Sequence, residues 1–250
     1  MSSIRPWILA ARPKTLFATL APIIVGISLS YKISNTIDWC LTSLIILSAV
    51  LLQIGSNYAN DAYDYLKGAD SQSRKGPKRM VQDGVLSANT VLNVMYIIFT
   101  LSVLIGYFLV KIGGWPIIVI GLSSIIFAII YTGGPYPLAY NGLGEITVFI
   151  FFGIIATVGT VYLQIVNSGF YFNLFNLEIF VAASSVGLLN TAILVVNNLR
   201  DIESDKLADK KTLAVKFGHQ FACYEFSLLL IINCLCYIWL ALKWSNYSFI

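Results

Sequence analysis

The stretch VLNVMYIIFTLSVLIGYFLV, residues 91–110, contains no charged side chain. As an α-helix it is long enough to cross the hydrocarbon core of a bilayer, which takes about 20 apolar residues. Its apolar residues do not alternate with polar ones, which argues against a strand of an outer-membrane barrel, typically about ten residues long. The stretch therefore predicts a transmembrane helix.

The whole chain has the same apolar character. It has 250 residues, of which 58% are hydrophobic and 11% are charged, and its mean hydropathy is +0.79. A soluble domain is typically about 45–50% apolar and about 25% charged. The composition excludes a disordered chain, a collagen-like fibre and a disulfide scaffold, and it indicates an integral membrane protein.

Further apolar stretches predict an all-α fold, a multi-pass transmembrane helical bundle with about seven spans. Each stretch is close to the roughly 17–25 residues that a membrane helix needs. The first is not a cleavable signal, because further spans follow and no small-residue cleavage site closes it. The predicted spans are residues 15–29, 39–53, 91–110, 115–131, 143–166, 177–196 and 221–242.

Basic residues are concentrated on one side of these spans, and this side is predicted to be the cytoplasmic face of the plasma membrane. The N-terminus and the two long polar loops would then be cytoplasmic. The formal net charge of +4 reflects this topology, because the chain has no clustered basic domain that would read a nucleic acid. The basic residues on this side are Arg5, Arg12, Lys14, Lys67, Arg74, Lys75, Lys78, Arg79, Arg200, Lys206, Lys210, Lys211 and Lys216, against Lys32, Lys111 and Lys243 on the other.

The cysteines and the single histidine give no sign of a metal or redox site. Cys234-x-Cys236 has no second pair and no nearby histidine, so the spacing of a zinc site is absent. We expect Cys40, Cys223, Cys234 and Cys236 to be buried small apolar side chains. We expect no metal or catalytic role for His219 at the start of the last span.

A first polar segment, QIGSNYANDAYDYLKGAD at residues 53–70, follows the second span. If the helix continues through it, Asn57, Asp61 and Asp64 are spaced i, i+4 and i+7 and share one face. Such a face would present carboxylate and carboxamide oxygens at the cytoplasmic end of the span.

A second polar segment, NNLRDIESDK at residues 197–206, follows the sixth span. Asn197, Asp201 and Asp205 are spaced i, i+4 and i+8, again close to one face of a helix. Both segments begin Asn-x-x-x-Asp, and no wider internal repeat is evident.

Hard oxygen ligands that converge from two helices suit Mg²⁺ better than zinc or copper. A divalent ion would relieve the repulsion between the acids and leave positions for phosphate oxygens. The alternative is a pair of solvated helix ends, where aspartate is ordinary, but two matching segments at one membrane face favour a metal–phosphate site. The nearby cations that would bind phosphate directly are Lys67, Arg74, Lys75, Lys78, Arg79, Arg200 and Lys211.

A third polar stretch, residues 131–145, joins the fourth and fifth spans on the same side. Its glycines and prolines indicate turns. It is not a G-x-x-x-x-G-K phosphate loop, and no strand precedes it, so a nucleotide cradle is not expected. Tyr131, Tyr140, Asn141 and Glu145 are its candidates for contacting a polar aromatic ligand.

These motifs together resemble the intramembrane aromatic prenyltransferases of the UbiA type, and most closely their dihydroxynaphthoate branch. The resemblance covers residues from about 7 to 218. It is carried by Trp7-Ile-Leu-Ala-Ala-Arg-Pro-Lys-Thr15, Asn60-Asp61-x-x-Asp64 with Gly68-x-Asp70, Gly76-Pro77-Lys78-Arg79-Met80-Val81, Tyr131-Thr132-Gly133-Gly134-Pro135, Asn197-Asn198-x-Arg200-Asp201-x-x-x-Asp205 and Lys211-Thr-Leu-Ala-Val215.

The resemblance implies a role for each polar segment. The two Asp-rich segments would face each other across the bundle and hold Mg²⁺ with the diphosphate of a polyprenyl donor, whose tail would run into the apolar bundle with a lateral opening to lipid. Asp61, Asp64, Asp201 and Asp205 would be catalytic. The metal ligands would be these four together with Asn57, Asn60 and Asn197, and the diphosphate would be bound by Lys67, Arg79, Arg200 and Lys211.

The implied reaction is Mg²⁺-dependent transfer of the polyprenyl chain to 1,4-dihydroxy-2-naphthoate with loss of CO₂ and diphosphate, giving demethylmenaquinol in menaquinone biosynthesis. Ionisation of the allylic carbon–oxygen bond would give a carbocation, which the aromatic ring attacks in a site shielded from water. Another acceptor such as 4-hydroxybenzoate or a chlorin, an inactive truncated homologue and a membrane carrier remain alternatives. A carrier would place its carboxylates near the middle of the bilayer, whereas these lie at the ends of their spans.

The family usually has nine spans, so residues 1–250 are expected to be one transmembrane prenyltransferase domain without its last two helices. Asp209 and Lys210 also depart from the sequence that the family resemblance leads us to expect before Lys211 in the second loop.

Overall fold

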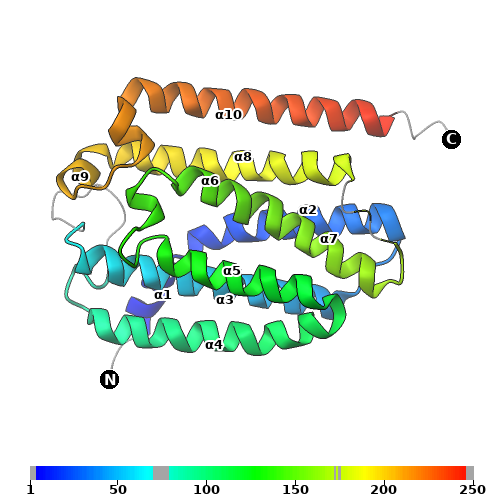
Figure 1. Ribbon diagram of the computed structural model, residues 1–250, viewed down its shortest axis with the longest axis horizontal. Helices are drawn as coiled ribbons and strands as arrows, with labels where there is room; N and C mark the ends of the chain where they lie inside the picture. Colours follow the sequence, from blue (N-terminus) through cyan, green and yellow to red (C-terminus); the bar gives the residue numbers. More distant parts are fainter. Residues whose placement is uncertain (1–3, 70–78, 172, 174–175, 246–250) are drawn as a thin grey trace.

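The computed structural model describes residues 4–69, 79–171, 173 and 176–245, and in them the chain is helical (Figure 1). Six helices are long and apolar enough to cross a membrane, so the predicted multi-pass helical bundle is confirmed. The helices are α1 (Arg5–Ala11), α2 (Pro13–Ser34), α3 (Trp39–Leu66), α4 (Ala88–Gly113), α5 (Trp115–Ile130), η1 (Leu138–Tyr140), α6 (Gly144–Phe149), η2 (Ile150–Ile155), α7 (Ala156–Asn167), α8 (Leu177–Arg200), α9 (Ile202–Leu207) and α10 (Leu213–Ser245).

Each of the seven predicted spans lies largely within one of these helices or helix runs. The fourth corresponds to α5, which has only 16 residues and is shorter than a typical full span. The fifth is formed by α6, η2 and α7 in series. The second span continues as one helix, α3, to Leu66, so the first polar segment is helical down to that residue.

Local chemistry explains where the long helices begin. The Asp38 side chain accepts a hydrogen bond from the backbone N–H of Leu41 at the start of α3, and Ser87 caps α4 in the same way through Thr90. Asn176 caps α8. Gly114, at φ 67°, makes the tight turn between α4 and α5, a backbone conformation that favours glycine.

Two irregular helices in the middle of the bundle are held by one side chain. Pro22 inside α2 has no N–H, so the carbonyl of Ala18, four residues earlier, has no partner from its own helix. Asn190 of α8 donates to this carbonyl at 3.3 Å and to the carbonyl of Phe152 in the π-helix η2 at 3.0 Å. Asn190 therefore joins α2, η2 and α8 in the middle of the bundle.

Close packing between backbones fixes the same region. An added Cβ on Gly153 would lie 2.5 Å from the Cα of Gly187, so η2 and α8 approach each other without side chains between them. A Cβ on Gly26 would lie 2.7 Å from the Cβ of Thr160, which brings α2 equally close to α7. These contacts leave little freedom for the four helices to shift relative to one another.

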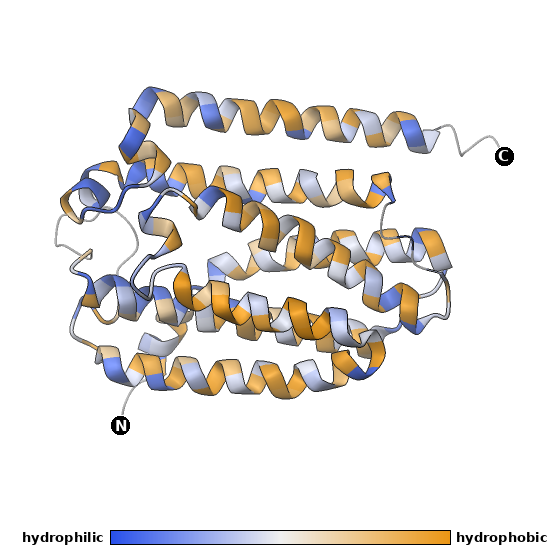
Figure 2. Ribbon diagram, viewed as in Figure 1, coloured by the Kyte–Doolittle hydropathy of each residue, from blue (hydrophilic) through white to orange (hydrophobic). Residues whose placement is uncertain are grey.

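Hydrophobic residues predominate along the long helices (Figure 2), and many of them are exposed on the outside of the bundle. Leu104, Ile126 and Leu228 are among many large apolar side chains that are more than half exposed. Such faces suit lipid rather than water. The chain is a multi-pass membrane protein.

One expectation about side-chain burial was wrong. Cys40 and Cys234 are exposed and Cys223 and Cys236 are half-buried, because these cysteines lie on outward faces of their helices. Hydropathy alone does not distinguish a side chain that packs against protein from one that faces lipid.

Candidate active site

A cavity of about 700 Å³ lies within the bundle and is bordered by α2, α3, α4, α5, α8 and the α6–α7 run. At one end it is lined by polar residues of α3 and α8, among them Asn60, Asp64, Asn197 and Asp201. Toward the other end it is lined by apolar residues such as Ile45, Leu109 and Ile117. One cavity thus joins the two Asp-containing segments to an apolar interior.

Asp64 of α3 lies at the centre of the polar end. Its carboxylate forms an ion pair with Arg79 and accepts a hydrogen bond from the Tyr140 hydroxyl at 2.7 Å. Arg79 also donates to the backbone carbonyl of Asn60 at 2.8 Å, and the Asn60 side chain accepts from Thr132 at 3.0 Å. Asp64 and Arg79 are both buried, so each compensates the charge of the other.

Asp61 does not share the cavity face with Asp64. A step of 100° per residue puts Asn57, Asn60 and Asp64 within one sector of α3, and Asp61 falls at its edge. Asp61 instead lies against the segment after Arg79, where its Oδ2 accepts from the backbone N–H of Met80 at 3.2 Å. Its Oδ1 is buried and accepts no hydrogen bond from the described residues.

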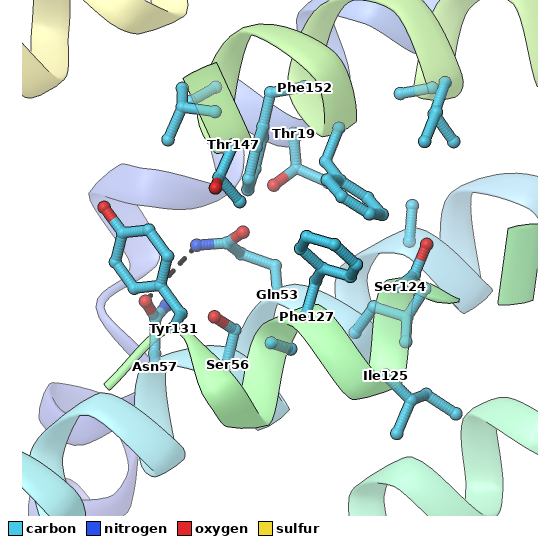
Figure 3. Close-up of a pocket in the computed structure, with 18 of the residues that line it drawn as sticks. Thr19, Gln53, Ser56, Asn57, Ser124, Ile125, Phe127, Tyr131, Thr147 and Phe152 are labelled. Carbon is cyan, nitrogen blue, oxygen red and sulfur yellow. Dashed lines mark hydrogen bonds between the residues drawn. The ribbon is translucent and has the colours of Figure 1, made fainter. Parts of the chain in front are cut away.

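Asn57, a predicted metal ligand, is held by hydrogen bonds to the α1–α2 junction. Its Nδ2 donates to the Ala11 carbonyl at 2.8 Å and to Thr15 Oγ1 at 2.9 Å. Its Oδ1 accepts from Gln53 Nε2 at 3.2 Å (Figure 3). With these groups engaged, Asn57 ties α3 to the start of α2.

In the second segment, Asn197, Asp201 and Asp205 all line the cavity, although they do not share the single helix that their spacing predicted, because α8 ends at Arg200 and Asp205 lies on α9. Arg200 makes a two-point contact with the neighbouring Asp201, through Nε at 2.8 Å and Nη2 at 2.7 Å. Asp205 of the short helix α9 lies 3.6 Å from Lys210. Burial raises the pKa of Asp205, an effect that nearby Lys210 opposes.

The predicted basic residues separate into two groups. Arg79 and Arg200 line the cavity. Lys67 and Lys211 do not line it: the first donates to the carbonyl of Gly134 at 3.0 Å, and the second lies 3.4 Å from the exposed Asp209. Arg74, Lys75, Lys78 and Asp70, with the first half of the Gly76–Val81 motif, lie outside the described residues.

Sequence reasoning missed two cations that line the cavity, Arg12 and Lys210. Arg12 has φ 51° at the turn between α1 and α2, where no sequence signal marks its side chain as pointing inward. The pair Lys210–Lys211 gives no periodicity by which to choose between its members, and the structure places Lys210 beside Asp205.

The 131–145 stretch contributes only part of its predicted residues to the cavity. Tyr131 lines it. Tyr140 belongs to the acid cluster through Asp64. Asn141 and Glu145 do not line the cavity: Asn141 donates to the Pro137 carbonyl at 2.7 Å, and Glu145 accepts from Asn198 at 2.8 Å.

The donor set fits a hard cation that is shared with a ligand. In the described part of the chain no three acidic, histidine or cysteine side chains come together as a ready-made metal centre. Mg²⁺, however, usually binds through one or two carboxylates and completes its shell with waters and substrate phosphates. The buried Oδ2 of Asp205 accepts no hydrogen bond from the described residues, so it is available to such an ion.

The fold and this site define a multi-pass membrane protein with an oxygen-rich pocket at one end of a long apolar cavity. The profile of the UbiA prenyltransferase family matches residues 19–250, and the chain belongs to this family. The family resemblance seen in the motifs is thereby confirmed.

Curated relatives and solved structures agree with this assignment. The chain is 37% identical to the 1,4-dihydroxy-2-naphthoate octaprenyltransferase of Haemophilus influenzae, over 99% of this chain and 82% of the relative. It is 37% identical to the Escherichia coli protein of the same name, over 94% of this chain and 76% of that protein. The structure of a UbiA homolog from Archaeoglobus fulgidus bound to GPP and Mg²⁺ has a TM-score of 0.70 at 18% identity, covering 95% and 78% of the two chains.

Proposed function

We propose that the chain transfers a polyprenyl group from polyprenyl diphosphate to 1,4-dihydroxy-2-naphthoate, releasing CO₂ and diphosphate and giving demethylmenaquinol. The cavity carries this proposal, because its charged end suits a diphosphate and its apolar interior suits a prenyl chain. The names of the relatives support the naphthoate acceptor. The ligands of the Archaeoglobus structure support a prenyl diphosphate donor and Mg²⁺.

At the charged end, Arg79, Arg200 and Lys210 are the side chains we assign to the diphosphate. Arginine offers two parallel N–H donors to phosphate oxygens, which fixes the orientation of the group. Asp64, Asp201 and Asp205 would hold Mg²⁺ with Asn60 and Asn197. When bound, the ion supplies positive charge that stabilises the leaving diphosphate.

The remaining steps use the shape of the cavity. The allylic carbon–oxygen bond of the donor breaks, and its electron pair leaves with the diphosphate. The ring carbon that carries the acceptor's carboxylate forms the new carbon–carbon bond, and the carboxylate leaves as CO₂. Apolar rings nearer the charged end, among them Phe127 of α5 and Phe152 of η2, would exclude water, which otherwise captures the carbocation as prenyl alcohol.

The direct test is the purified full chain in lipid nanodiscs with geranyl diphosphate, Mg²⁺ and each acceptor separately. Mass spectrometry should find prenylated naphthalenediol and released diphosphate with dihydroxynaphthoate. Product from 4-hydroxybenzoate alone would make the naphthoate assignment wrong. Absence of any prenylated product from either acceptor would contradict prenyl transfer to both and leave the carrier and inactive-homologue alternatives.

We also propose that the acidic end of the bundle faces the cytoplasm, since the basic residues lie there. The test uses a background without the four native cysteines. Asp209→Cys, beside α9, should react with a membrane-impermeant thiol reagent only from the cytoplasmic side. Tyr171→Cys, 91% exposed between α7 and α8, should react only from outside. The reverse pattern would contradict the orientation.

A further inference from the structure

Hydroxyl groups inside the helices of this chain usually donate to the carbonyl four residues earlier, as helical serine and threonine often do. Ser30 donates to Gly26 at 2.7 Å, Thr160 to Ala156 at 2.7 Å and Thr191 to Gly187 at 2.9 Å. Thr19 of α2 and Thr157 of α7 depart from this habit. Each has a buried Oγ1 with no hydrogen-bond partner among the described residues.

Only one of these two threonines faces the cavity. Thr19 lines it, whereas Thr157 does not and is fully enclosed by protein. A buried hydroxyl without a partner costs free energy comparable to a lost hydrogen bond. The Thr19 hydroxyl is therefore placed to bond something that enters the cavity.

Gln53 of α3 points into the same part of the pocket as Thr19 (Figure 3). Its Nε2 is engaged with Thr15 Oγ1 at 3.3 Å and with Asn57 Oδ1 at 3.2 Å. These bonds fix the amide, and its Oε1 accepts no hydrogen bond from the described part of the chain. Thr19 thus offers a donor and Gln53 an acceptor from two adjacent helices.

Aromatic rings surround this pair. Phe127 of α5, Phe152 of η2 and Tyr131 lie around the space into which Thr19 and Gln53 point (Figure 3). The Phe127 ring also packs against Phe151, with 4.8 Å between ring centroids. A pocket of apolar rings with a few placed polar groups is the usual form of a site for a flat ligand.

We propose that Thr19 and Gln53 bind a ring hydroxyl of the aromatic acceptor, a hydroxylated aromatic compound, between these rings. The hydroxyl donates to Gln53 Oε1, and Thr19 Oγ1–H donates to the same ring oxygen. This rests on the proposed function and deepens it, because it replaces most of the 131–145 stretch as the acceptor site. Tyr140 and Glu145 of that stretch are already bonded to Asp64 and Asn198.

The position suits the reaction geometrically. Gln53 lies on the same face of α3 as Asn60, seven residues or about 10 Å along the helix. A ring held there would lie just inside the charged end, where the first carbons of the prenyl chain leave the diphosphate. Neutral groups at this depth also avoid placing a charge within the membrane.

The test is Thr19→Val, which removes the hydroxyl and keeps the shape, with Thr157→Val as matched control. Thr157→Val also removes a buried hydroxyl without a partner, but outside the cavity. Losing one hydrogen bond between neutral groups should weaken dihydroxynaphthoate binding about 2- to 12-fold in Thr19→Val. Thr19→Ser should restore it, and Thr157→Val should bind as the wild type does.

Two measurements make the outcome specific. Equilibrium binding of dihydroxynaphthoate to the protein in nanodiscs needs no turnover, and saturation curves should place the effect on acceptor KM and not on prenyl diphosphate KM. An acceptor analogue without the ring hydroxyl that Thr19 and Gln53 bind should have the same affinity for Thr19→Val as for the wild type.

Equal binding by Thr19→Val and wild type would overturn the proposal, as would an effect on donor KM alone or an equal loss in Thr157→Val. A wild type that binds no hydroxylated aromatic ring would overturn it as well. Specific binding that weakens in Thr19→Val, without prenyl transfer by the wild type, would uphold the subsite and contradict the proposed function.

Discussion

The two ends of the bundle differ in their hydrogen bonding. At the end where α2 passes into α3, polar side chains form hydrogen bonds with one another. At the end that carries the aspartates, each of two buried carboxylates has one oxygen that accepts no hydrogen bond from the described residues. Gln164 accepts from the Asp38 N–H at 3.1 Å and donates to the Asp38 carbonyl at 3.1 Å and to Thr42 at 2.9 Å. Asp61 and Asp205, at the cavity end, are the contrasting pair.

The satisfied end also includes a second network between helices. Glu178 of α8 accepts from Lys32 of α2 at 3.0 Å and from the indole of Trp244 at 2.7 Å, which ties in the end of α10. This difference in hydrogen bonding indicates that the two ends of the bundle have different roles. Complete hydrogen bonding holds helices together, and incomplete bonding at a residue that lines the cavity, here Asp205, leaves a group available to a ligand.

The largest effect is expected from Arg79→Met, which breaks the buried ion pair between Arg79 and Asp64 of α3. Asp64 would remain buried without its counter-charge, at a cost of about 3–5 kcal/mol in the free energy of unfolding. Denaturant titration in mixed micelles measures this loss. Asp64→Leu added to Arg79→Met should recover most of the stability but no prenyl transfer; a stable single variant would contradict the argument.

At the same acidic end of the bundle, Asp205→Asn should lower turnover without a comparable loss of stability. Removing a carboxylate assigned to the metal and diphosphate should lower turnover on the order of 10²–10³-fold, as for other preorganised electrostatic groups. The unfolding free energy should change little, because Oδ2 has no partner from the described residues and the cost of burying the charge offsets its attraction to Lys210, 3.6 Å away. Asp209→Asn, an exposed acid outside the cavity, is the control and should keep full turnover.

Much of this division could be predicted from the sequence, since it rests on hydropathy and spacing. The spans follow from hydropathy, whereas Asn197, Asp201 and Asp205 meet at the cavity without sharing one helix, because α8 ends at Arg200 and Asp205 belongs to α9. The orientation of Asp61 did not follow, because a residue at the edge of a helical face is turned in or out by its neighbour, here the backbone of Met80.

The groups that periodicity cannot identify are those set by tertiary contacts. Lys210 and not Lys211 lies beside Asp205, and Tyr140 bonds Asp64 across 76 residues of sequence. The hydrogen bonds between Gln164 and Asp38 at the other end of the bundle also cannot be predicted from periodicity, because the two residues are 126 positions apart in the sequence. Hydropathy patterns carry no information about which polar residues of distant helices will meet.

Gln164→Leu tests the satisfied end. The substitution keeps the volume but leaves the Asp38 backbone N–H without its acceptor, and it removes one donor each from the Asp38 carbonyl and Thr42 Oγ1, at a cost of about 1–3 kcal/mol. Turnover per folded molecule should not change, because Gln164 lies at the far end from the acids. Gln220→Leu, at an exposed position of α10, is the control and should leave stability near the wild-type value. A loss of turnover without a loss of stability would mean that the two ends are not separate.

The smallest effect is expected from Asp38→Asn, and its pH dependence sharpens the comparison. The hydrogen bond from the Leu41 N–H, more than any other contact, lowers the pKa of Asp38 in the folded protein. A lowered folded-state pKa means that the charged form stabilises the fold above the ordinary aspartate range, and that this stabilisation is lost as pH falls through the folded value. Asparagine still caps the helix through Oδ1, so the substitution removes the charge at the N-terminus of α3, worth about 0.3–1 kcal/mol, together with the oxygen that accepts from Asn167 Nδ2 at 2.9 Å. Thermal unfolding should show Asp38→Asn slightly less stable than the wild type at pH 7, with the difference shrinking as pH falls below about 4, the ordinary aspartate pKa. The exposed Asp83→Asn, outside this network, is the control; a difference that grows toward acid would contradict the assigned role of the Asp38 charge.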